Sequence, residues 1–104
     1  MTPVVWAHLK DGTFYEQVDV LRRYPNTYLD VAAGINLAMG SVEYAVKHLG
    51  SKRVLFGSDF TVVDPCVTRA RIEHAYLTAP EKEDILGRNA YQLLARLGKT
   101  FPSA

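Results

Sequence analysis

The sequence predicts an α/β fold with a short parallel sheet, and three observations support this prediction. Apolar segments of strand length recur three times along the chain, each is followed by a segment with the apolar spacing of a helix, and the unit repeats about every 25 residues. Consecutive right-handed βα units of this kind build a parallel sheet. The chain has 104 residues, 48% hydrophobic and 22% charged, which is enough to bury the core of one small domain.

The first unit starts with a continuous apolar run, Pro3–Ala7, which ends at His8. A run without alternation is typical of a buried strand in a parallel sheet. Thr13 and Glu16 have the Ser/Thr-x-x-Glu spacing of a capping box, and apolar residues follow at helical intervals. The sequence therefore predicts a helix from this point to about Tyr24.

The second unit begins with the β-prone segment Thr27–Val31, which Gly34 is expected to end. Ser41 is a suitable N-cap for a second helix, over Val42–Leu49, whose apolar residues lie at i, i+3, i+4 and i+7. Gly50 is the natural stop for that helix.

The third unit contains the strand Val54–Phe56, and Gly57 and Ser58 then turn the chain into Asp59. Its apolar residues predict burial on both faces. Asp64 followed by Pro65 is the pattern of a helix start, leading into a helix over about Cys66–Ala75.

The remainder of the chain is predicted to be helical. Thr78 and Glu81 form another capping-box pattern, and Gly87 is expected to interrupt the helix that follows. Asn89 is then expected to cap a last helix with leucines on one face.

Charge and composition exclude several classes of partner. The formal net charge is +1 with no basic block, which argues against nucleic acid. The apolar runs are shorter than the roughly 18 residues of a membrane span, and the first residues lack the charged start of a secretory signal, so a cytoplasmic location is expected. Cys66 is the only cysteine, which excludes an internal disulfide and a thiolate metal cluster.

Three polar residues stand at or just after the ends of the predicted strands: His8, Asp30 and Asp59. All strands of a parallel sheet present their carboxyl ends at the same edge, where α/β proteins bind their ligands. We therefore expect these three side chains to lie along one rim, although they are far apart in the sequence.

The chain contains four characteristic segments in this order: Val5–His8, Arg23–Asp30, Val46–Phe60 and Glu83–Ala90. Together they resemble the amidohydrolase-related family. This family contains metal-dependent hydrolases and decarboxylases of carboxylated aromatic or unsaturated rings, all built as (β/α)8 barrels. The resemblance covers nearly the whole chain and implies that residues 1–104 form one domain, a partial barrel equivalent to the last three βα units plus carboxyl-terminal helices.

The resemblance also implies roles for the rim residues. Asp59 corresponds to the aspartate that binds a divalent metal, zinc or manganese, and orients or deprotonates its water. His8 corresponds to the histidine that polarises the substrate or the attacking water, and Asp30 is a candidate for binding a small-molecule substrate. The alternatives are structural: a His8 imidazole bonded to a carbonyl, Asp59 as a cap, and Asp30 bonded to nearby backbone.

The sequence departs from the family pattern in two ways. Thr61 stands where the family usually has proline, and the His-x-His pair of the first barrel strand and the ligand of the fifth have no counterpart. His48 and His74 are instead expected at a helix end and on a helix surface. We therefore expect no tight metal binding and no activity from this chain alone.

Three hypotheses follow. The chain is the carboxyl-terminal part of a metal-dependent hydrolase or decarboxylase, with Met1 an internal or misplaced start, and carries only part of its site. Alternatively it is a nonenzymatic remnant or interaction module that uses its exposed sheet edges to form homo-oligomers or to pair with the missing barrel half. The third hypothesis is an unrelated, doubly wound binding module in which the Asp59 loop meets a ligand or Mg²⁺.

Overall fold

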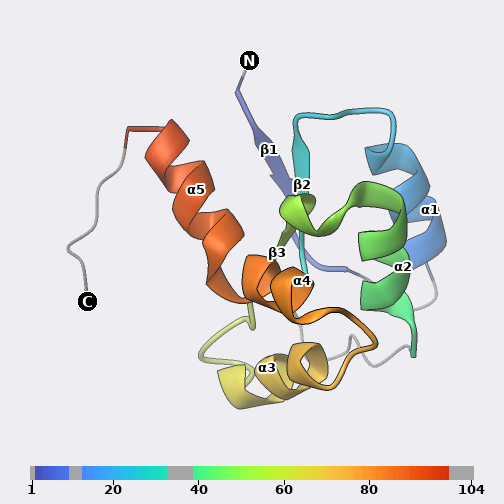
Figure 1. Cartoon of the computed structure of the whole chain (residues 1–104), viewed down its shortest axis with the longest axis vertical. Helices are drawn as coiled ribbons and strands as arrows, with labels where there is room; N and C mark the ends of the chain where they lie inside the picture. The colour runs from blue at the N-terminus through green and yellow to red at the C-terminus, as the bar shows by residue number, and fades with distance from the viewer. Residues whose placement is uncertain (1, 10–12, 33–38, 99–104) are drawn as a thin grey trace.

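The computed structural model describes residues 2–9, 13–32 and 39–98, which contain three parallel strands in one sheet (Figure 1). The strands lie in sequence order, with Val5 opposite Tyr28 and Leu29 opposite Val54. The predicted α/β class with consecutive parallel strands is therefore confirmed, whereas the predicted break at Gly34 lies outside the described residues. The strands are β1 (Val4–Trp6), β2 (Thr27–Asp30) and β3 (Val54–Leu55).

Helical segments connect the strands and cover the sheet. Figure 1 shows the strands between α1 and α2 on one side and α5 on the other, with α3 beyond the carboxyl ends of the strands. The segments are α1 (Phe14–Leu21), α2 (Ser41–Leu49), the 3₁₀ turn η1 (Ser51–Arg53), α3 (Pro65–Glu73), α4 (Ala79–Glu83), the π-helical turn η2 (Asp84–Arg88) and α5 (Asn89–Arg96). None of the helices in the described part of the chain combines the length and apolar character needed to cross a membrane.

The core lies between the sheet and the helices. It takes at least one fully buried side chain from each of six elements, so strands and helices share one apolar interior. These side chains are Val18, Leu29, Val42, Val54, Ile72 and Ile85.

Two predicted helix starts are confirmed. Asp64 accepts a hydrogen bond from the Cys66 amide at 2.9 Å, with Pro65 in the first turn of α3. Thr78 and Glu81 form the reciprocal capping box of α4: the Glu81 amide donates to the Thr78 hydroxyl, and the Thr78 amide donates to the Glu81 carboxylate. Each cap satisfies amide groups that have no partner within the helix.

Two other predicted caps are wrong. Thr13 precedes α1 but makes no side-chain capping bond, so the Thr13–Glu16 capping box does not form. Ser41 lies inside α2 as its first residue, fully buried, and the N-cap is Gly40 at a φ of +85°. A left-handed backbone at this position favours glycine over serine.

The prediction for the last helix is also wrong at its start. The chain stays helical through Gly87 as the π-helical turn η2, so Asn89 lies within a continuous helical run and does not cap it. Its buried side chain instead donates to the carbonyls of Ser51 and Val54, the latter at 2.8 Å. Asn89 therefore joins the last helix to the third strand.

Helix α1 ends at Leu21, three residues earlier than predicted. The Arg53 guanidinium donates to the carbonyls of Leu21, at 2.6 Å, and Tyr24, at 2.9 Å, and also to the carbonyl of Thr27. Because one side chain satisfies the last carbonyl of the helix, a carbonyl of the turn that follows and the first carbonyl of β2, the chain turns directly into the sheet.

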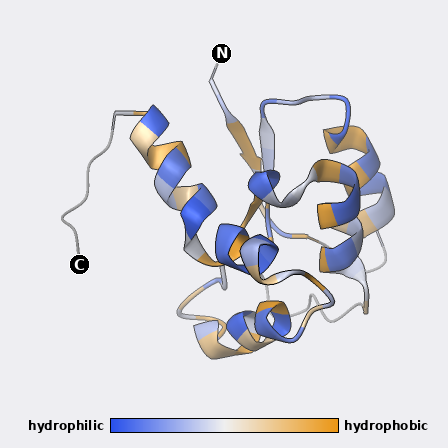
Figure 2. Ribbon diagram, in the orientation of Figure 1, coloured by the Kyte–Doolittle hydropathy of each residue, from blue (hydrophilic) through white to orange (hydrophobic). Residues whose placement is uncertain are grey.

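The predicted burial of the first strand is wrong. Val4, Val5 and Trp6 are 57%, 44% and 39% exposed, although Figure 2 shows β1 as one of the hydrophobic segments of the ribbon. The strand pairs with β2 on one edge, and no described residue forms a strand on its other edge. The apolar pattern is that of a covered strand, but the described chain supplies no cover for this side.

Asp84 is a buried carboxylate that stabilises the junction between η1 and η2. Burial alone raises its pKa, but the hydrogen bonds from Ser51 and Lys52 and the charges of Lys52 and Arg88 outweigh burial, so the pKa lies below its ordinary value. A carboxyl whose pKa is lower in the folded state contributes stability above its unfolded pKa and loses it as the pH falls through the folded pKa.

Asp84→Asn is therefore expected to lower the free energy of unfolding at pH 7 by about 2 kcal/mol, because hydrogen bonds to a buried charge are lost. The difference between the variant and the wild type should begin to shrink as the pH falls below about 4, the ordinary pKa of an aspartate in the unfolded chain. It should continue to shrink as the pH falls toward the lower pKa of Asp84 in the folded chain. Thermal unfolding between pH 3 and pH 7 measures this. A difference that does not depend on pH would contradict an ionised Asp84.

Candidate functional site

The three polar residues at the carboxyl ends of the strands come from three neighbouring elements. His8 follows β1 by two residues, Asp30 is the last residue of β2, and Asp59 follows β3 by four. His8 Nε2 lies 3.1 Å from Asp59 Oδ1, so the first and third units meet across the end of the second. Their side chains remain 41% and 38% exposed, and the pair faces solvent.

The backbone of His8 is fixed from two sides in a conformation that few residues adopt. Its φ is +73°, in the left-handed region. The buried Gln17 side chain of α1 donates to the His8 carbonyl at 2.7 Å, and the Leu9 amide donates to the Asp30 carbonyl at 2.9 Å. Strand β2 and helix α1 together therefore hold the imidazole at the rim.

Asp59 also has a left-handed backbone, with a φ of +61°. Its carbonyl accepts hydrogen bonds from the amides of Val62, at 2.7 Å, and Val63, at 3.1 Å, so the chain turns tightly just after it. Aspartate tolerates this conformation better than most residues. The turn directs the carboxylate back toward His8.

Asp30 is half-buried beside this pair. Its Oδ1 accepts a hydrogen bond from the Ala32 amide at 2.5 Å, which is the strand-end backbone contact that the sequence allowed as an alternative. Burial raises the pKa of Asp30. The Ala32 amide and the charge of His8 oppose that rise, and the charge of Asp59 adds to it. The Asp30 carboxyl thus interacts electrostatically with both members of the pair while it accepts a hydrogen bond from the nearby Ala32 amide.

The bond between His8 and Asp59 limits where protons lie. A carboxylate accepts hydrogen bonds only, so His8 donates to Asp59 in the tautomer that carries a proton on Nε2. Because both side chains are more than a third exposed, the pair contributes little to stability. What the arrangement provides is a proton carrier held against a carboxylate at an open rim.

The other candidate residues do not join the rim pair. The His48 ring lies 4.3 Å from the Tyr44 ring, centroid to centroid, in the last turn of α2, and His74 ends α3. Cys66 is exposed in the first turn of α3. Sequence reasoning missed Gln17, although a polar residue on the apolar face of a predicted helix is a detectable sign of a buried contact.

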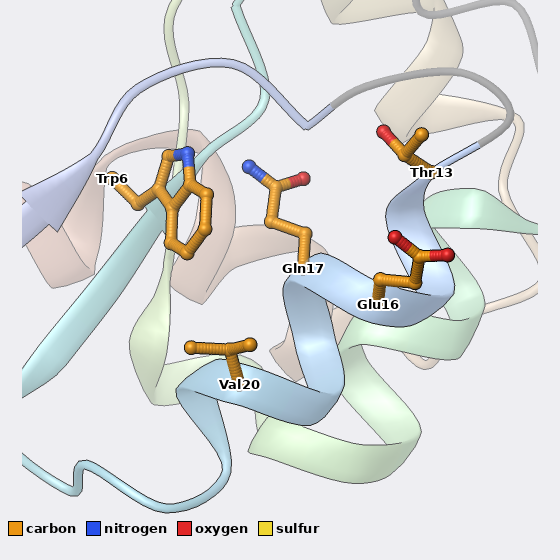
Figure 3. A pocket seen from close by; sticks show the side chains of 5 residues that line it. All are labelled: Trp6, Thr13, Glu16, Gln17 and Val20. Atoms are coloured by element: carbon orange, nitrogen blue, oxygen red, sulfur yellow. The ribbon is translucent and has the colours of Figure 1, made fainter.

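A separate pocket of about 240 Å³ lies between β1 and α1 (Figure 3). Trp6 and Val20 form its apolar part, and in Figure 3 the Gln17 side chain extends toward Trp6. The polar residues Thr13 and Glu16 line its other end. None of the three rim residues lines this pocket, so it is separate from the His8–Asp59 pair.

The donor set of the rim is incomplete for a metal. Within residues 2–9, 13–32 and 39–98, no group of three or more His, Cys, Asp or Glu side chains could hold an ion. The pair supplies one imidazole and one carboxylate, whereas catalytic zinc usually takes three protein ligands. The described residues therefore do not form a metal centre by themselves.

Parallel βα units with polar residues gathered at the carboxyl ends of the strands are the arrangement in which α/β proteins commonly bind ligands. The sequence matches the Amidohydrolase family over residues 1–96, and the chain belongs to that family. This membership removes the hypothesis of an unrelated binding module. Among curated proteins, none matches the chain.

Solved structures with the same fold include decarboxylases and an amidohydrolase. A 2,6-dihydroxybenzoate decarboxylase from Rhizobium is 14% identical, with a TM-score of 0.72, over 93% of this chain and 35% of its own. A dihydroxybenzoic acid decarboxylase from a Polaromonas species, with bound manganese and the inhibitor 2-nitroresorcinol, is 18% identical, with a TM-score of 0.73, over 94% and 35%.

An amidohydrolase from Burkholderia multivorans with bound zinc is 18% identical, with a TM-score of 0.65, over 89% of this chain and 44% of its own. At these identities the likeness shows the fold alone. The chain spans about a third of the length of the two decarboxylases, so most of each of those proteins has no counterpart here.

Proposed function

We propose that residues 1–104 are the carboxyl-terminal three βα units of a (β/α)8 barrel and carry one wall of the active site of a metal-dependent hydrolase or decarboxylase. The observation that carries the proposal is the 3.1 Å contact between His8 Nε2 and Asp59 Oδ1 at the carboxyl ends of the first and third strands. Family membership and the fold likeness support it.

Each rim residue has a role in this proposal. Asp59 is one ligand of the metal, because a hard carboxylate suits zinc or manganese. His8 gives or takes a proton at Nε2, and Asp30 contacts the substrate. A divalent ion, once its other ligands are present, lowers the pKa of a bound water and polarises a substrate oxygen.

The proposal is tested in what we call the complemented enzyme: this chain combined, in cis or in trans, with the barrel units that it does not contain. The first substrate to assay is 2,6-dihydroxybenzoate, with release of CO₂ as the readout, followed by amides. We expect turnover that needs Mn²⁺ or Zn²⁺ and stops with a chelator. No metal-dependent turnover of either substrate class would contradict the proposal.

The chain alone is expected to bind zinc weakly, with a dissociation constant above about 1 μM at pH 7, because a catalytic shell needs more ligands than one carboxylate and one imidazole. Calorimetric titration of the isolated chain with Zn²⁺ measures this. A submicromolar site that survives Asp59→Asn would place the metal elsewhere in the chain.

A second candidate function, a self-associating interaction module, is favoured by the open edge of β1. Its three side chains are apolar and exposed, and its outer edge pairs with no strand in the described chain. The opposite edge of the sheet differs. Leu55 bonds to β2 through its carbonyl, so the Val54 carbonyl faces outward, where Asn89 binds it. Association is therefore expected at β1 and limited at β3.

Light scattering of the isolated chain is expected to give a mass above 11.6 kDa. Val5→Lys puts a charge in the middle of β1 and should return the mass to that of a monomer, because a charged residue on an edge strand opposes pairing. Val67→Lys, at a similarly exposed valine in α3, is the matched control and should not change the mass. A monomeric wild type would remove this candidate.

A further inference from the structure

Gly57 lies between β3 and Asp59, directly against the Asp30 side chain. A Cβ atom built on Gly57 would lie 2.7 Å from Asp30 Oδ1 and 2.9 Å from Oδ2, closer than side-chain carbons approach other atoms. The backbone of Gly57 is not in the left-handed region, so an L side chain meets no conformational barrier there. The space taken by the Asp30 carboxylate is therefore the reason that this position requires glycine.

The Asp30 carboxylate has little freedom to avoid such a contact. Asp30 is paired with Leu55 in the sheet, which fixes its Cα, and its Oδ1 accepts the Ala32 amide. A methyl group at position 57 therefore has to push the carboxylate away from the Ala32 amide, because the paired backbone of β2 and β3 is stiffer than the side chain. The end of a short side chain moves before the sheet does.

We infer that Gly57 is a positioning residue. Because it has no side chain, it leaves the space in which the Asp30 carboxylate lies beside His8 and Asp59. The steric contact stands on the geometry alone, whereas the value of that place for substrate binding rests on the proposed function. Gly57 itself contacts no reacting group in this account. It acts through Asp30.

The first test reads the position of the carboxylate directly. In ¹H–¹⁵N spectra of the isolated chain, Gly57→Ala is expected to shift the Ala32 amide signal toward its place in Asp30→Ala, because the hydrogen bond to Oδ1 is lost in both. Gly87→Ala is the matched control, since a Cβ there meets nothing within 4 Å. An Ala32 signal unchanged by Gly57→Ala would overturn the inference.

The second test measures coupling between the two positions. Gly57→Ala is expected to lower Tm by several degrees in the wild type and by much less in the Asp30→Ala background, where the carboxylate is gone. The effect of the substitution on the unfolded chain is the same in both backgrounds and cancels. Equal losses in both backgrounds would overturn the inference. If Gly57→Ala does not fold, the double variant is still expected to fold, and its failure would overturn the inference as well.

The proposed function is tested by a different measurement, so its failure can be distinguished from failure of the inference on Gly57. In the complemented enzyme, Asp30→Ala and Gly57→Ala are both expected to raise KM more than they lower kcat, because both remove the same substrate contact. Coupling in the isolated chain, with KM unchanged in the complemented enzyme, would keep the positioning role of Gly57 and reject the substrate role of Asp30.

Discussion

Asp59→Asn is expected to abolish metal-dependent turnover in the complemented enzyme while leaving the fold of the chain nearly unchanged. The amide keeps the shape of the carboxylate and can still meet His8, so packing at the rim is retained. It is a weaker ligand for a divalent ion, and it takes up no proton at neutral pH. Steady-state rates and metal content of the purified variant measure both effects.

Asp64→Asn is the matched control for this substitution. Asp64 is an exposed aspartate five residues further along the same loop, where it caps α3, and asparagine is an equally good N-cap. The control is expected to keep both metal and activity. If Asp59→Asn also keeps both and instead loses several degrees in Tm, Asp59 is a structural cap and its proposed role is wrong.

His8→Ala is expected to lower kcat in the complemented enzyme by roughly 10²- to 10⁴-fold, the usual contribution of a general acid or base. The metal should be retained, because His8 is assigned to proton transfer and not to the ion. The measurements are kcat over a range of pH and the metal content.

Two further variants separate chemistry from folding at this position. The left-handed backbone of His8 disfavours alanine, whereas asparagine tolerates it, so His8→Asn should lose the same activity with a smaller loss of Tm. His48→Ala removes an imidazole that contacts the Tyr44 ring at a tilt, away from the rim, and should leave kcat unchanged. Loss of metal in both His8 variants would make His8 a ligand and contradict the assignment.

The order and direction of the strands were predictable because they depend on local patterns. Apolar runs such as Val54–Phe56 and the helical spacing between them follow from short stretches of sequence, and the parallel arrangement follows from the connections. Burial of β1 was not predictable in the same way. Its apolar run indicates what a neighbour would cover, but it carries no information on whether the neighbour is part of this chain.

Two of the three failed caps, Ser41 and Asn89, have a common cause. Serine and asparagine in front of an apolar helix are frequent caps, but Ser41 and Asn89 are both buried in tertiary contacts. Asn89 binds the Val54 carbonyl, 35 residues earlier, and a local rule does not include such a partner. By contrast, the caps at Asp64 and Thr78 involve residues two or three positions away and were predicted correctly.

The candidate site, too, could be predicted from the sequence only in part. His8 and Asp59 could be chosen because both follow strands and match family segments. The left-handed backbone at both positions and the contact of Gln17 with the His8 carbonyl appear only in the folded chain. The need for glycine at position 57 arises from a side chain on the neighbouring strand, which no pattern around Gly57 indicates.

The central claim is that the carboxyl ends of the three strands form one wall of a metal site. Titration of Mn²⁺ into the complemented enzyme, with only this chain labelled with ¹⁵N, tests it through paramagnetic broadening. We expect broadening of the amides of His8, Asp30 and Asp59, while those of Asn26 and Arg53, at the opposite ends of the strands, stay sharp. Broadening centred on Asn26 and Arg53, or none in this chain at saturating Mn²⁺, would contradict the claim.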